Sequence, residues 1–170
     1  KRPDQPIPTM ENLSNLGLVG VEASYALRVA RLVSNENHWL QRLTVNYAWL
    51  RADRKAEGFQ SFYTLNYLRH KLSLGAALRL ARNLSLDAWY TFKQREGEYQ
   101  WDAATPPQPY AAIHLVDTRL TWTRPNGRFF ADATNLLNQT YYEHGFVTQP
   151  GRWLTAGVQW VVNQKRQNNE

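Results

Sequence analysis

The sequence of 170 residues contains no cysteine, one methionine and four histidines. Without cysteine, the chain forms no disulfide framework and no thiolate metal site. It also contains no run of about eighteen apolar residues, so the sequence predicts no transmembrane helix. No apolar core follows the opening Lys1-Arg2-Pro3-Asp4. Because a signal peptide would show one, we expect a processed or excised piece of a longer protein.

Acidic residues are in the minority, since 14 Asp and Glu stand against 20 Lys and Arg for a net charge of +6. A nucleic-acid-binding protein gathers such charge into a compact patch or a known motif. Here the basic residues are spread along the chain among acidic ones, so we expect no nucleic-acid partner. The histidines lie far apart, and none has paired carboxylates at metal-ligand spacing. We therefore expect no enzyme, no metal site and no cofactor.

Apolar residues alternate with small or polar residues near the end of the chain. One parity is apolar: Leu154, Ala156, Val158, Trp160 and Val162. The other parity is small or polar: Thr155, Gly157 and Gln159. Alternate residues of a β-strand point to opposite faces, so this stretch predicts a strand with one apolar face. Such a strand suits a membrane barrel with a hydrated lumen, and it also suits a soluble β-sandwich.

The same alternation recurs upstream and predicts an all-β protein of about seven strands. The expected strands are 19–29, 39–49, 71–80, 84–93, 116–122, 129–134 and 152–162. Nine of their charged residues keep to the polar parity: Glu22, Arg42, Lys71, Arg79, Asp87, Lys93, Asp117, Arg119 and Asp132. A charge that faces lipid costs roughly 2–4 kcal/mol near the bilayer midplane, so this confinement fits a membrane barrel. Solvated charges on the outer face of a sandwich fit the same pattern.

The lengths of the connections favour the membrane barrel. Short turns are expected at 34–37, 81–83 and 125–127, and long connections at 52–69, 96–112 and 138–152. Outer-membrane barrels have short periplasmic turns and long extracellular loops. Aromatic residues at both strand ends agree with two interfacial girdles: Trp39, Trp122, Phe129 and Trp160 at one end, and Tyr47, Trp49, Tyr90 and Phe92 at the other. An odd strand count predicts that the barrel continues upstream of this chain.

Two motifs stand near the end of the chain: the segment 130–142, which contains Asn135-Leu136-Leu137-Asn138, and the segment 149–153, which contains Pro150-Gly151-Arg152. Together they resemble the C-terminal part of TonB-dependent outer-membrane receptors. Weaker likenesses lie upstream at Gly20-Val21-Glu22 and Arg69-His70-Lys71-Leu72. The resemblance implies that residues 1–162 are the C-terminal portion of a plugged barrel of about 22 strands. Residues 163–170 are then a polar tail, which we expect to be disordered.

The resemblance further implies active uptake of a scarce ligand through the outer membrane of a Gram-negative bacterium. Its partners would be outer-membrane lipid, a small ligand such as a ferric siderophore, and TonB, reached through a plug domain that this chain lacks. Haem or cobalamin uptake, a structural or adhesive barrel without transport, and a soluble all-β binding module remain alternatives. Aromatic and basic side chains of the long loops are the ligand-binding candidates: Tyr63, Tyr99, Trp101, Tyr110, Tyr142, His144, Arg95 and Arg152.

Overall fold

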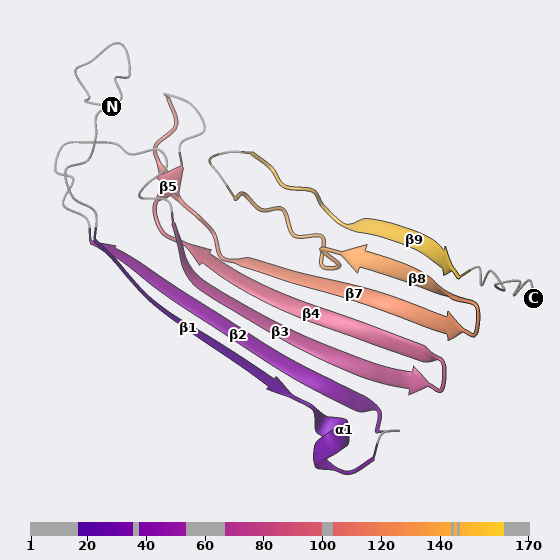
Figure 1. Ribbon diagram of the computed structural model, residues 1–170. Coiled ribbons are helices and arrows are strands. Elements are labelled where there is room, and N and C mark those ends of the chain that lie inside the picture. The colour runs from indigo at the N-terminus through magenta and orange to yellow at the C-terminus, as the bar shows by residue number, and fades with distance from the viewer. Residues whose placement is uncertain are drawn as a thin grey trace, which may run out of the picture.

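A computed structural model describes residues 17–35, 38–53, 67–99, 104–143, 145 and 147–161. These residues form a seven-stranded antiparallel sheet in which neighbours in sequence are neighbours in space (Figure 1). Its strands are β1 (Gly17–Leu27), β2 (Leu40–Asp53), β3 (Leu68–Ala81), β4 (Leu84–Arg95), β7 (Ile113–Arg124), β8 (Gly127–Thr134) and β9 (Trp153–Trp160). The prediction of an all-β chain with about seven strands is confirmed.

Successive connections lie at opposite edges of this sheet because every pair of neighbouring strands is antiparallel. One edge, the long-connection edge, carries residues 54–67, 96–112 and 135–152. The second of these contains a small hairpin of β5 (Glu98–Tyr99) and β6 (Gln108–Pro109). The opposite edge, the short-turn edge, carries the two-residue turns at 82–83 and 125–126. For these five connections, the predicted separation of long connections and short turns onto opposite edges of the sheet is confirmed.

The connection between β1 and β2 departs from the prediction of a short turn. It spans residues 28–39 and contains a short helix, α1 (Val29–Leu32). The strand expected over 19–29 therefore ends early, because the run after Val29 favours helix and the amide of Val33 donates to the Val29 carbonyl at 3.1 Å. Ser34, with φ of 49°, then turns the chain out of the helix. In the described part of the chain, no helix is long and apolar enough to cross a membrane.

The strand register confirms that the two parities form two faces of one sheet. One row of directly paired residues crosses five strands: Tyr25, Val45, Leu74, Tyr90 and Val116. The face with this row is the apolar face. The opposite face, the polar face, carries the nine charged residues that the sequence assigns to the polar parity, and there Asp87 pairs with Arg119 and Arg119 with Asp132. Two hydrogen bonds of 2.6 and 2.8 Å join the Arg119 guanidinium to the Asp132 carboxylate.

Two aromatic side chains on the polar face lie over glycines of neighbouring strands. Trp89 is paired directly with Gly75, and Phe130 with Gly157. A Cβ atom at Gly157 would lie 2.4 Å from the Phe130 ring, and one at Gly75 would lie 3.2 Å from the Trp89 ring. The absence of a side chain at each glycine thus makes room for the aromatic ring opposite. This packing explains how two large rings fit among the charges of the polar face.

No second layer of structure covers the apolar face anywhere in the described ranges. Four hydrophobic residues among them are buried, namely Ala52, Tyr110, Ile113 and Leu115. Val19 and Val158, by contrast, are 65% and 59% exposed on the apolar face. An exposed apolar surface that continues over seven strands marks an interaction with lipid or protein. The apolar face of the sheet therefore requires contact with lipid or with another protein surface.

Candidate ligand site at the long-connection edge

Four of the ligand-binding candidates meet at the long-connection edge of the sheet. Tyr99 lies in β5, Tyr110 follows β6, Arg95 ends β4, and Tyr142 lies in the connection 135–152. We call these four residues, together with Lys93 and Glu143, the edge cluster. The candidates Tyr63, Trp101 and His144 lie outside the described residues.

Three tyrosines form an aromatic wall within the edge cluster. The ring centroid of Tyr99 lies 5.1 Å from that of Tyr110 and 5.5 Å from that of Tyr142, with which it stacks. Tyr110 is only 8% exposed, and its hydroxyl accepts a hydrogen bond of 2.9 Å from the amide of Gly145. The Arg95 guanidinium lies 5.9 Å from the Tyr110 ring centroid, within the range of a cation–π contact. A ligand with a flat ring and a negative charge would therefore find an aromatic wall and a cation side by side here.

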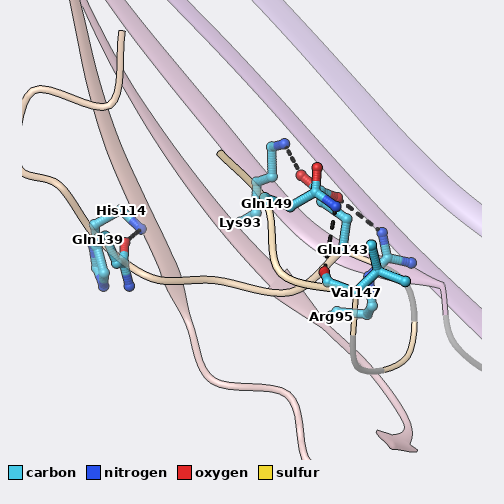
Figure 2. A network of polar contacts seen from close by, with 7 residues as sticks. All are labelled: Lys93, Arg95, His114, Gln139, Glu143, Val147 and Gln149. Atoms are coloured by element: carbon cyan, nitrogen blue, oxygen red, sulfur yellow. Dashed lines mark hydrogen bonds and ion pairs between the residues drawn. The ribbon is translucent and has the colours of Figure 1, made fainter. Parts of the chain in front are cut away.

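A carboxylate already lies against the two cations of the edge cluster. Glu143 accepts hydrogen bonds from Lys93 Nζ and from Arg95 Nη2, the latter at 3.3 Å (Figure 2). The side chains of Lys93, Arg95 and Glu143 are only 20%, 10% and 20% exposed. Burial of Glu143 disfavours its charge, but the hydrogen bonds and charges of Lys93 and Arg95 outweigh that effect and hold its pKa below the ordinary 4.5.

The depressed pKa of Glu143 predicts a loss of order at low pH. Because this pKa is lower in the folded than in the unfolded chain, the ion pair contributes stability above the unfolded value, and that contribution is lost as pH falls through the folded value. We expect the hydrogen-exchange protection factor of the Gly145 amide, which bonds to Tyr110, to fall between pH 6 and about pH 3. Protection factors of amides in the centre of β3 are the control. Equal protection of Gly145 at both pH values contradicts the prediction.

The sequence did not identify Glu143 as part of the site, although a signal was present. Lys93 and Arg95 are two positions apart in one strand, so their side chains share a face at its end. An acidic residue in an adjacent aromatic-rich connection is the natural partner of such a pair. In the same connection as Glu143, burial raises the pKa of the Tyr141 hydroxyl, whereas the positive charge of Lys93 opposes that rise.

Arg152 lies apart from the edge cluster, in a hydrogen-bonded knot around Asn135. The Arg152 amide donates to Asn138 Oδ1 at 2.8 Å, and its guanidinium Nε donates to the Leu136 carbonyl at 3.0 Å. Asn135 is 5% exposed and has φ of 48°. Its side-chain amide donates to the carbonyls of Gln139 and Pro150, at 2.9 and 3.2 Å. The two C-terminal motifs of the sequence therefore form one structural unit that fixes the connection 135–152.

The same unit ties the connection to the neighbouring strand β7. The backbone amide of Asn135 donates to Asp117 Oδ1 at 2.8 Å. The side-chain carbonyl of Gln139 accepts a hydrogen bond of 2.6 Å from the backbone amide of His114 (Figure 2). Gly151 fits because a Cβ atom there would lie 2.8 Å from Asn138 Oδ1. The knot thus holds the base of the connection, from which Tyr142 and Glu143 reach the edge cluster.

Two Tyr–His pairs occupy equivalent places on the apolar face near the same edge. The Tyr47 hydroxyl bonds to His70 Nδ1, and the Tyr90 hydroxyl bonds to His114 Nδ1, both at 2.8 Å. The pairs bridge β2 to β3 and β4 to β7, and the register places Tyr47 and His114 in one row across the sheet. Such a band of rings with polar tips is typical of a boundary between an apolar phase and water. The pairing could not be read from the sequence because it depends on the register.

Within the described residues, no group of three or more His, Asp or Glu could hold a metal ion. The chain matches no protein-family profile, no characterised protein and no solved structure.

Proposed function

We propose that this chain forms part of the wall of an outer-membrane β-barrel, with the apolar face toward lipid and the polar face toward the lumen. The observation that supports this most is the uncovered apolar face, which runs across all seven strands. Nine charges within the strands lie on the other face, and the strand charges on the apolar side, Arg51, Asp53 and Arg124, lie at or near strand ends. A soluble sandwich would bury that face under a second sheet. The aromatic band with its Tyr–His pairs lies where the lipid headgroups would meet the strands.

The two outermost strands of the sheet, β1 and β9, support a larger assembly. Within the described residues, β1 and β9 each pair on one side only. Unpaired backbone groups are not tolerated in lipid, so the wall would continue into further strands beside β1 and beside β9. The purified chain should accordingly need detergent or lipid to stay dispersed. Stable dispersion and monomeric behaviour in plain buffer would favour the alternative of a soluble binding module.

The proposed orientation places the long-connection edge outside the cell. Because the chain has no cysteine, a single Gln108→Cys substitution in β6 gives a unique labelling site. We expect a membrane-impermeant maleimide to label it in intact cells. Cysteine at Asn126, in a turn at the opposite edge, is the matched control and should react only after the outer membrane is disrupted. Labelling in the reverse order would invert the topology.

We further propose that the barrel is a TonB-dependent receptor that takes up an anionic iron–siderophore complex. The C-terminal motifs that carry the resemblance form the knot around Asn135, and the edge cluster offers an aromatic wall beside two cations. Flat rings and negative charge are what iron chelates present to such groups. Energy would reach the barrel through TonB and a plug domain. Haem and cobalamin receptors, and a structural or adhesive barrel, are the other candidates.

Growth under iron limitation tests the ligand assignment. A strain that lacks the gene for this chain should lose growth on at least one siderophore of a panel and regain it on complementation. Loss of cobalamin uptake or haem use alone would replace the siderophore with that ligand. Unchanged growth on every iron, haem and cobalamin source would favour a barrel without transport.

A further inference from the structure

We propose that Glu143 occupies an anion subsite between Lys93 and Arg95, and that an incoming anionic ligand takes this subsite by displacing the carboxylate. The inference rests on the proposed function, because it assumes that the long-connection edge receives a ligand. It adds that a carboxylate of the receptor itself offsets part of the positive charge at this point. Glu143 would thus be both a placeholder for the anionic group of the ligand and a contact that ligand binding breaks (Figure 2).

The positive charge at this point belongs to the sheet itself. Lys93 is paired directly with Lys71 across β3 and β4, so two like charges face each other on the polar face. Like charges in this arrangement destabilise a sheet, and an anion between or beside them relieves the repulsion. Arg95 adds a third cation on the same strand as Lys93 and lies over the Tyr110 ring. Strand positions therefore fix an anion-binding centre independently of the connection that supplies Glu143.

The carboxylate comes from a connection and not from a strand of the sheet. Glu143 lies beyond the knot around Asn135, and several contacts among the described residues hold this stretch. These include the Tyr142–Thr148 bridge and the hydrogen bond from the Gly145 amide to the Tyr110 hydroxyl. A rigid cationic centre and a carboxylate on a connection together form an exchangeable pair. The carboxylate can leave without disturbing the strands that hold the cations.

The aromatic wall defines the chemical class of the displacing ligand. Tyr110 lies under Arg95, and Tyr99 and Tyr142 stack beside it. A ligand that places a negative group on Lys93 and Arg95 would therefore lay its adjoining atoms against the more exposed rings of Tyr99 and Tyr142. A flat aromatic anion, such as an aryl carboxylate, sulfonate or catecholate, meets both demands.

A matched pair of probes separates the charge from the ring. Naphthalene-2-sulfonate stays ionised over the whole working pH range, and naphthalene-2-sulfonamide has the same ring without the charge. Binding of each probe to the full chain in detergent micelles is measured by fluorescence at pH 7. We expect Glu143→Gln to bind the sulfonate about tenfold more tightly than the unmodified chain, with little change for the sulfonamide. Glu143→Asp, which keeps the carboxylate, should not show this gain.

Glu96→Gln is the matched control, because Glu96 also forms an ion pair at this edge, at 2.9 Å from Arg69. It should leave sulfonate binding unchanged, and Lys93→Gln should weaken it. Circular dichroism establishes that each variant keeps its strand content. The inference is overturned if Glu143→Gln binds the sulfonate no more tightly than the unmodified chain, or if it tightens both probes equally. Either result leaves the membrane-wall proposal standing, since the cysteine labelling at Gln108 tests that separately.

Discussion

Leu74→Arg is expected to lower the free energy of unfolding in a bilayer by roughly 2–4 kcal/mol, whereas Ser73→Arg should cost much less. Leu74 lies near the middle of β3 on the apolar face, between Val45 and Tyr90 of the neighbouring strands. In the proposed membrane wall, an arginine there would enter the hydrocarbon region, where no water or counter-charge is at hand. Ser73 is the adjacent residue at nearly the same depth, but it faces the polar side, opposite Asn46 and Thr91.

Denaturant titration of both variants in lipid bilayers measures this difference directly. The pair Val158→Arg and Gln159→Arg repeats the comparison on β9, where Val158 is 59% exposed on the apolar face. The comparison also separates the membrane wall from a soluble protein. In water an exposed leucine tolerates replacement by arginine, so a change within about 0.5 kcal/mol at Leu74 would contradict a lipid-facing position.

The faces of the sheet could be predicted from the sequence because a strand has a period of two. Every charge assigned to the polar parity lies on the polar face, since an antiparallel meander of strands keeps directly paired residues on the same side. The turns at 82–83 and 125–126 carry asparagine or proline, and the loop positions followed from that chemistry. Local signals of this kind do not depend on how distant strands are aligned.

Features that depend on local competition or on distant contacts were not predicted. The alternation reaches Val29, yet β1 pairs with β2 only as far as Leu27, and the residues from Val29 close helical hydrogen bonds instead. The alternation also says nothing of Trp89 and Phe130, which fit the polar face only because glycines lie opposite. Both outcomes are set by what a neighbouring strand offers.

The candidate site was predicted in part. The sequence indicated that Tyr99, Tyr110, Tyr142 and Arg95 lie in long connections at one edge, and the structure brings these four together. It could not show that Glu143 would lie between Lys93 and Arg95, because residues about fifty positions apart meet only when the connections fold over the edge. Arg152 was grouped with them by charge and loop position, but its hydrogen bonds belong to the knot around Asn135.

Asn135→Ala is expected to lower the free energy of unfolding by about 3 kcal/mol, a large effect for one loop residue. Two causes add together. The side-chain amide that bonds to the carbonyls of Gln139 and Pro150 is lost, and so is the carbonyl that accepts from the Gln139 amide at 2.9 Å. The backbone at φ of 48° also suits asparagine far better than alanine, because the left-handed region costs an alanine about 1 kcal/mol.

Asn135→Gly separates these two causes, because glycine accepts the left-handed backbone but supplies no side-chain hydrogen bonds. We expect the glycine variant to recover about 1 kcal/mol of the loss and no more. Thermal unfolding in detergent, followed by circular dichroism, gives the order unmodified chain, Gly and Ala. Recovery of full stability by glycine would mean that backbone strain alone matters and that the bonds to Gln139 and Pro150 do not. Because the knot holds the base of the connection that carries Tyr142 and Glu143, both variants should also weaken sulfonate binding at the edge cluster, and the alanine variant should weaken it more.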